Sequence, residues 1–188
     1  MNTKPLLLLD IDGVLCPFHW QTLPEGCRQI DVVINGTTCQ GRYIDTLTVA
    51  FDERQLARLE RLAEAFELVW ATIWEEFANT KLAPLTGLPL LPVILIDASI
   101  PSPVPVRFSE LMAGNTTEKL GPVAAYVGER PFAWVDDQLR YDATDWAKER
   151  DATGLPTLLV RTDPRVGLTD AEVAQLLAFA SSLTQPVA

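Results

Sequence analysis

Histidine and cysteine, which often carry nucleophilic or zinc chemistry, are scarce in this sequence. The chain has one histidine, His19, and three cysteines, Cys16, Cys27 and Cys39. No two cysteines show the C-x-x-C spacing that is typical of structural zinc sites. We therefore expect free thiols in a reducing compartment, with a metal site built from these four residues as the alternative.

A long apolar segment is also missing. No stretch approaches the roughly 20 apolar residues that a membrane-spanning helix needs. The apolar run at residues 5–9 is too short for the core of a signal peptide, and acidic residues follow it. We therefore expect a cytoplasmic protein without a membrane partner.

Basic residues are fewer than acidic residues in this sequence. The chain has 15 Lys and Arg residues against 25 Asp and Glu residues, for a net charge of −10 and a pI near 4.5. Such a chain repels nucleic acid unless a local basic patch overrides the field, and no run of basic residues forms one. Charge therefore does not favour a nucleic-acid partner. A small phosphorylated substrate is compatible with it, because a bound cation can reverse the local field.

The pattern that is present is an alternation of apolar runs and amphipathic stretches. With 48% hydrophobic residues in 188, the chain predicts a single domain over residues 1–188. Alternating strands and helices predict an α/β fold, a doubly wound Rossmann-like parallel sheet of about five strands with helices on both faces. We expect strands at 5–11, 67–72, 91–96, 131–135 and 157–161, and helices at 52–66, 74–82, 116–126, 142–150 and 170–183.

Residues 13–50 break this alternation. They contain several prolines and glycines, and an Asn35-Gly36 pair separates two β-favouring stretches at 30–34 and 38–49. Asn-Gly is the strongest two-residue signal for a β-hairpin turn. We expect a small hairpin inserted after the first strand, either as a simple insertion or as a flap over the entrance to a site.

Acidic residues follow two of the predicted buried strands. Asp10 and Asp12 follow the first, and Asp136 and Asp137 follow the fourth. In open α/β sheets, ligands bind outside the carboxyl ends of the strands. Like charges gathered there repel each other unless a cation holds them, and Mg²⁺ prefers oxygen ligands. Four acids at two such ends favour a metal site over the alternative that each acid only caps a turn.

Residues 6–15, LLLLDIDGVL, resemble motif I of the haloacid dehalogenase-like superfamily, in which an apolar strand leads into D-x-D-G. The resemblance implies that Asp10 attacks phosphorus to form an aspartyl-phosphate. It also implies that Asp12 protonates the leaving group and later activates water. Both roles suit carboxyl groups. The second acid favours phosphoryl transfer over dehalogenation.

The other motifs of that superfamily can be placed in order. LVWAT supplies Thr72 as the group that binds a phosphoryl oxygen, and Lys119 matches the phosphate-binding lysine, with Lys81 and Arg107 as rivals. FAWVDD supplies Asp136 as a direct Mg²⁺ ligand and Asp137 as a ligand through water or a loop anchor. The metal set implied by the resemblance is therefore Asp10, Asp12 (through its backbone carbonyl), Asp136 and Asp137.

A closer similarity connects longer stretches, VWAT-x-W-E-x-x-A-N and Y-V-G-x-R-P-F-A-W-V-D-D, to the phosphatase-like domain of "Swiss army knife" RNA-repair proteins. It implies processing of RNA ends. No large cap domain is present, which implies an open site for large or extended substrates or a partner that closes it.

We therefore expect a Mg²⁺-dependent phosphatase. The alternatives are an RNA end-processing phosphatase or phosphotransferase and a catalytically silent binding protein.

Two side chains near the strand ends each have two possible roles. His19 would assist at the mouth of the site or be an incidental loop residue, and Trp74 would stack on a substrate ring or pack in the core. An RNA substrate would call for a basic strip near the strand ends, formed by Arg107, Lys119, Arg130 and Arg140.

Overall fold

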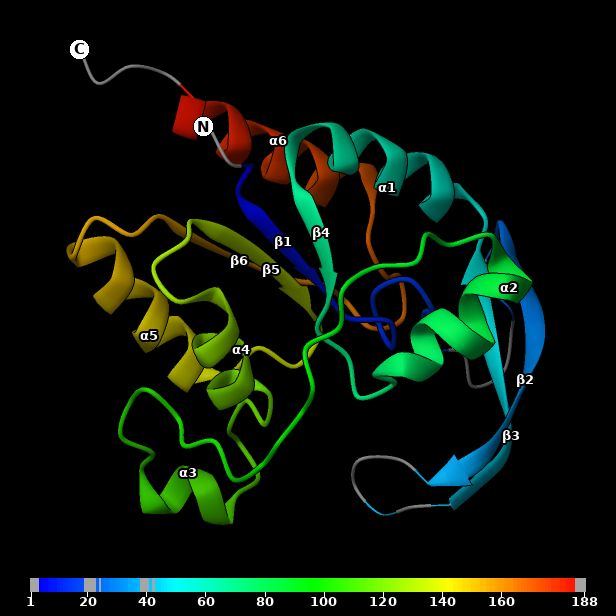
Figure 1. Cartoon of the computed structure of the whole chain (residues 1–188), viewed down its shortest axis with the longest axis horizontal. Coiled ribbons are helices and arrows are strands. Elements are labelled where there is room, and N and C mark those ends of the chain that lie inside the picture. Colours follow the sequence, from blue (N-terminus) through cyan, green and yellow to red (C-terminus); the bar gives the residue numbers. More distant parts are fainter. Residues whose placement is uncertain (1–3, 19–22, 24, 38–40, 42, 185–188) are drawn as a thin grey trace.

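A four-stranded parallel sheet forms the centre of the computed structural model, which describes residues 4–18, 23, 25–37, 41 and 43–184 (Figure 1). The strand order is β4-β1-β5-β6. The strands are β1 (Leu6–Leu9), β4 (Glu67–Trp70), β5 (Phe132–Asp136) and β6 (Thr157–Arg161). This arrangement confirms the predicted α/β class.

Helices cover both faces of the sheet. Helices α1 (Arg54–Ala65) and α6 (Asp170–Thr184) pack on one face, and α4 (Leu120–Val127) and α5 (Tyr141–Ala152) pack on the other. Alternate residues of β1 point to opposite faces, so Leu7 and Leu9 join one core cluster while Leu6 and Leu8 join the other. All four leucines are fully buried. This explains the unbroken apolar run before Asp10.

The predicted strand at 91–96 is wrong: it is reduced to a single bridge between Trp70 and Val93, so the sheet has four strands rather than about five. Two local features limit the pairing. Pro92 has no N–H to donate to a ladder. The backbone N–H and C=O of Leu91 are bound instead by the side chain of Asn79, at 3.1 and 2.9 Å.

The inserted hairpin is present, but its turn is not where the sequence predicts it. Strands β2 (Cys27–Thr37) and β3 (Tyr43–Asp52) pair antiparallel as a separate sheet. Asn35 has a φ of 46° and lies inside β2, where the register shifts between Val33 and Gly36. The left-handed backbone expected of Asn-Gly therefore forms an irregularity within a strand. The strands connect over residues 38–42, most of which lie outside the described residues.

The remaining helices differ from the predictions mainly at their ends. The stretch predicted at 74–82 contains a π-helix, η1 (Ala78–Leu82), and continues into α2 (Ala83–Thr86). The helix predicted from residue 116 begins at Leu120, and α3 (Phe108–Met112) was not predicted. Within the described part of the chain, no helix is both long and apolar enough to span a bilayer.

Two helix starts differ in how their first backbone N–H groups are bound. Glu53, not Asp52, is the cap residue of α1, and Asp52 lies one residue earlier, where its Oδ1 accepts a hydrogen bond from the Arg54 backbone N–H at 3.0 Å. Thr169 caps α6: its Oγ1 accepts a hydrogen bond from the Ala171 N–H at 3.2 Å. Glu172 reaches back to the Thr169 backbone N–H at 2.9 Å, which completes a capping box.

Candidate active site

The loop after β1 directs Asp10 into the end of the sheet. The Asp10 backbone N–H still donates to the Val135 carbonyl, at 3.1 Å, and the side-chain Oδ1 accepts from the Ile11 N–H at 2.8 Å. Gly13 then turns the chain away with a φ of +70°, and a Cβ at this position would lie 2.8 Å from Cγ of Asp137. Only glycine therefore fits between the loop and the acid that follows β5.

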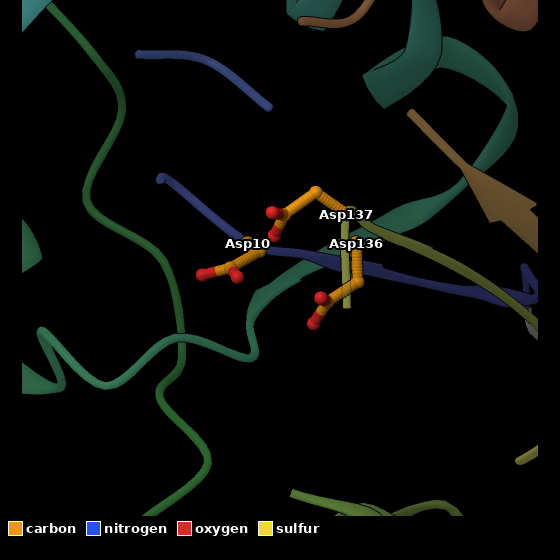
Figure 2. Close-up of side chains that lie close together, drawn as sticks. All are labelled: Asp10, Asp136 and Asp137. Carbon is orange, nitrogen blue, oxygen red and sulfur yellow. The ribbon is translucent and has the colours of Figure 1, made fainter. Parts of the chain in front are cut away.

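Asp10, Asp136 and Asp137 converge at the carboxyl ends of β1 and β5. Each offers a carboxylate oxygen, and these oxygens lie within 4.8 Å of one another. Figure 2 shows the three side chains extending into a common space. Oδ1 of Asp137 is buried and has no hydrogen-bond partner among the described residues. Three clustered oxygen donors, one of them without a partner, fit a hard divalent cation such as Mg²⁺.

Burial and mutual repulsion disturb the ionisation of these acids. Burial, followed by the charge of Asp10, raises the pKa of Asp136 to about 6, although Lys119 opposes the shift. The pKa of Asp137 is raised for the same reasons in the same order. A bound cation would favour the ionised forms of all three carboxyl groups.

Lys119 is the cation that the fold brings to this cluster. Its Nζ lies 2.6 Å from Oδ2 of Asp10 and 2.5 Å from Oδ2 of Asp136, and it donates to the Ala71 carbonyl at 3.1 Å. Burial alone would lower the pKa of Lys119, but the two carboxylates outweigh it and the pKa is raised. The rival Lys81 lies in η1 and forms no ion pair with a described carboxylate.

The position of Lys119 depends on how α4 begins. The carboxylate of Asp142 accepts hydrogen bonds from the Thr117 backbone N–H at 2.9 Å and from its hydroxyl at 2.8 Å, which ties the segment before α4 to α5. Gly121, in the first turn of α4, packs directly against the loop at residues 97–101. A Cβ there would lie only 2.2 Å from the Ile100 carbonyl oxygen. These contacts hold the lysine at the strand ends.

The Asp12 side chain is not one of the three clustered carboxylates and binds a tryptophan instead. The indole Nε1–H of Trp74 donates to Oδ2 of Asp12 at 2.9 Å. Burial, then the charge of Asp10, raises the pKa of Asp12 to about 6, while the hydrogen bond from Trp74 works in the opposite direction. Trp74 is only 5% exposed, so it packs in the core and leaves little ring surface for stacking on a substrate.

Thr72 follows β4 and is fully buried. Its Oγ1 accepts a hydrogen bond from the Trp74 backbone N–H at 3.3 Å, and the preceding carbonyl, that of Ala71, binds Lys119. Thr72 therefore lies beside the lysine at the same end of the sheet, and its hydroxyl hydrogen has no acceptor among the described residues.

The hairpin lines the approach to Asp12. A cavity of about 220 Å³ is bounded by Asp12, Cys16, Pro17, Phe18 and β3 residues 47–50. A smaller one of about 70 Å³ separates Asp12 and Trp74 from residues of both hairpin strands. His19 and Cys39 lie outside the described residues. Cys16 and Cys27 are free thiols, and burial raises the pKa of Cys16 well above its ordinary value.

The basic residues near the site are fewer than the proposed strip. Arg130 lies at the opposite end of the sheet, where it pairs with Glu67 at 2.6 Å and donates to the Lys4 carbonyl at 3.1 Å. Lys4 precedes β1 and Glu67 begins β4, so both lie at the amino ends of the strands. Arg130 therefore does not belong to the basic strip proposed at the carboxyl ends. Arg161, which the sequence did not single out, lies at the end of β6, and its Nε donates to the Asp137 carbonyl at 3.1 Å.

The parallel sheet flanked by helices is consistent with the Rossmann-like fold of haloacid dehalogenase-like proteins. A family model described as the HAD domain in Swiss Army Knife RNA repair proteins matches residues 6–173, which include every residue of the site. The chain belongs to this HAD family. Comparison with curated proteins and comparison with solved structures each gave no match.

Proposed function

We propose that this protein is a Mg²⁺-dependent phosphatase, a phosphoric monoester hydrolase that acts through an aspartyl-phosphate on Asp10. The observation that carries the proposal is the environment of the Asp10 carboxylate. It lies 2.6 Å from the ammonium of Lys119 and within 4.8 Å of oxygens of Asp136 and Asp137. Positive charge beside an oriented carboxylate suits an attack on a phosphoryl group.

In the first step, an Asp10 oxygen attacks phosphorus and the bond from phosphorus to the leaving oxygen breaks. Asp12, protonated, gives its proton to that oxygen, so the product leaves as an alcohol. Two features support this role: the hydrogen bond from Trp74 orients the Asp12 carboxyl group, and its raised pKa increases the protonated fraction near neutral pH over that of an ordinary aspartate.

In the second step, water attacks the phosphorus of the aspartyl-phosphate. Asp12, now ionised, accepts a proton from the water. The bond between phosphorus and the Asp10 oxygen breaks, which releases phosphate and restores the carboxylate. One residue thus serves as acid and then as base, and the charges and atoms balance over the cycle.

Asp10, Asp136 and Asp137 would hold the metal, with the Asp12 backbone carbonyl as a further ligand. When bound, Mg²⁺ supplies positive charge that offsets the charge of the phosphoryl group. Lys119 supplies a fixed charge of the same kind. The Thr72 hydroxyl would donate a hydrogen bond to a phosphoryl oxygen.

The direct test is release of p-nitrophenol from p-nitrophenyl phosphate by the wild type and Asp10→Asn, each with and without Mg²⁺. We expect Mg²⁺-dependent turnover that falls by about a thousandfold or more in the variant, because the nucleophile is lost. Circular dichroism and thermal melting serve as the control for folding. Normal turnover by a folded Asp10→Asn protein would remove Asp10 as the nucleophile.

A second candidate is an RNA end-processing phosphatase or phosphotransferase that uses the same residues. The family description supports it, since it refers to RNA repair proteins. Equal turnover of p-nitrophenyl phosphate and of phosphorylated RNA ends would argue against an RNA preference. A catalytically silent binding protein is the least supported candidate, because Asp10 and Asp12 are both present and lie at the site.

A further inference from the structure

A further cavity, of about 320 Å³, lies at the far edge of the sheet, where β6 ends and α5 begins. Arg140, Tyr141 and Thr144 line it from the start of α5, Arg161 from the end of β6, and Asn115 from the loop after α3. In Figure 1, α5 lies on the other side of the molecule from the β2–β3 hairpin, so this cavity is distinct from the one beside Asp12.

Arg161 connects this cavity to the carboxylate cluster. It is the register partner of Asp136 in the β5–β6 pair, and paired residues of parallel strands direct their side chains to the same face of the sheet. Neighbouring strands lie only about 5 Å apart. The guanidinium is oriented by the hydrogen bond from its Nε to the Asp137 carbonyl at 3.1 Å. Arg161 is therefore one strand away from the proposed metal site.

Neither Arg140 nor Arg161 forms an ion pair with a carboxylate of the described residues. Four other arginines do have carboxylate partners within 4.0 Å: Arg28, Arg54, Arg58 and Arg130. Two guanidinium groups therefore line one cavity without an ion pair to a described carboxylate, although the charge of Asp137 acts on Arg140. Such a pair of arginines suits an anion, because the planar arginine fork matches phosphate oxygens.

The other walls of the cavity are compatible with an anion. The start of α5, a helix of 12 residues, places the positive end of a helix dipole there. The Arg107 guanidinium lies 5.1 Å from the centre of the Tyr141 ring and adds a third positive charge nearby. The carboxylates on this side have partners: that of Glu110 accepts a hydrogen bond from the Asn115 side chain at 2.6 Å, and that of Asp142, in the first turn of α5, accepts one from the Thr117 hydroxyl at 2.8 Å.

We propose that this cavity is a second phosphate subsite, which binds a phosphate group of the substrate next to the one that is hydrolysed. The inference rests on the proposed function for the first phosphate. The substrate class is then a phosphate monoester that carries a further phosphate close by. Two sources share this chemistry: the terminal phosphate of an oligonucleotide with its adjoining phosphodiester, and a nucleoside bisphosphate.

Binding to Asp10→Asn, which would hold the substrate without turning it over, tests the subsite. Calorimetry in Mg²⁺ would compare a nucleoside 5′-monophosphate, a nucleoside 3′,5′-bisphosphate and a dinucleotide with a terminal phosphate. We expect one or both of the ligands with a second phosphate to bind about tenfold to a hundredfold more tightly than the monophosphate, as charge-assisted hydrogen bonds predict. Preference for the dinucleotide alone would identify the phosphodiester source, and preference for the bisphosphate alone the small-molecule source.

Adding Arg140→Gln to Asp10→Asn is expected to reduce this preference to about twofold or less. Arg140→Glu should abolish it. Lys148→Gln, which removes an exposed charge from the same helix away from the cavity, is the matched control and should keep the preference. Equal binding of all three ligands, or a preference that survives Arg140→Glu, would overturn the subsite.

The experiments distinguish a failure of the phosphatase proposal from a failure of the subsite proposal. If p-nitrophenyl phosphate is not hydrolysed but the preference depends on Arg140, the subsite stands and the phosphatase does not. If hydrolysis is normal and no preference exists, the phosphatase stands and the subsite does not.

Discussion

At the residue scale, Asp136 is bound through both of its carboxylate oxygens. Oδ1 accepts a hydrogen bond from the Gln138 backbone N–H at 2.8 Å, and Oδ2 faces Lys119 at 2.5 Å. The neighbouring Asp137 leaves Oδ1 without a partner. The two adjacent acids therefore differ in how far their orientation is determined before any cation binds.

This difference leads to a prediction for the metal requirement. Asp136→Asn removes a negative charge from the cluster, so the Mg²⁺ concentration for half-maximal activity should rise by at least about tenfold. A Mg²⁺ titration of p-nitrophenyl phosphate hydrolysis measures it, with Asp137→Asn in parallel. If only the Asp137 variant needs more Mg²⁺, then Asp137 is the dominant ligand.

A second residue-scale prediction concerns the orientation of the proposed acid. Trp74→Phe removes the indole N–H that binds Asp12, so kcat should fall by about tenfold, part of the usual contribution of a positioned acid. Because that hydrogen bond lowers the pKa of Asp12, its loss should also shift the corresponding limb of the pH–rate profile upward.

Trp134 offers a matched control, because its Nε1 is buried and has no hydrogen-bond partner among the described residues. Trp134→Phe makes the same change of ring without removing a hydrogen bond. Equal losses of kcat in the two variants, with no shift of the pH profile, would mean that Trp74 acts only through packing.

At the scale of the elements, the capping box at the start of α6 is a local device with a measurable effect. Thr169→Ala removes the side-chain acceptor for the Ala171 N–H and the hydroxyl that donates to Glu172, and should lower the free energy of unfolding by about 1 kcal/mol. Urea denaturation gives this value. Ser181→Ala, near the other end of α6, is the control, and a similar loss there would contradict a specific role for the cap.

The sequence predicted the elements best where local pattern and tertiary structure agree. The strand expected at 157–161 is β6 at both ends, since a short β-branched and leucine-rich run has no competing use there. The strand expected at 91–96 failed because the Asn79 side chain takes the backbone groups of Leu91. The Asn35-Gly36 turn failed because a register shift in a strand accommodates the same left-handed backbone.

Some features of the site could likewise be predicted from the sequence and others could not. Asp10, Asp136 and Asp137 could be predicted together because all of them follow buried parallel strands. The hydrogen bond between Trp74 and Asp12 joins residues that are 62 positions apart, and no local sequence pattern predicts it. The fold was also needed to show that Lys119, and not Lys81, lies beside Asp10 and Asp136.

At the scale of the whole molecule, one charge network connects the hairpin to the helical layer. Arg58 on α1 pairs with Asp52, at the end of β3, at 3.2 Å and with Asp170, at the start of α6, at 3.0 Å. It also donates to the Leu168 carbonyl at 2.8 Å. The network lies at the meeting point of three elements from distant parts of the chain.

This network predicts a pH dependence of stability. Burial acts to raise the pKa of Asp52, but the hydrogen bonds and charges of Arg54 and Arg58 outweigh it, so its pKa is lowered in the folded protein. A lowered folded pKa means that the stabilisation is present above the unfolded pKa and is lost as the pH falls through the folded pKa.

Unfolding in urea between about pH 7 and pH 3 would therefore show a loss of stability at the acidic end, and Asp52→Asn should make that part of the curve flatter. Asp145→Asn removes an acid from an exposed pair with Lys148 and should leave the curve nearly unchanged. An Asp52→Asn curve parallel to that of the wild type would show that this carboxylate does not contribute to acid sensitivity.

The close packing at Gly121 limits which substitutions this position can accept during evolution. Glycine has no reactive side chain. A Cβ at this position would nevertheless lie 2.2 Å from the Ile100 carbonyl oxygen and would displace α4, the helix that begins after Lys119. Selection for activity would therefore act on this position through packing alone. A family member that carried a larger residue at position 121 would need a compensating change in the loop at 97–101.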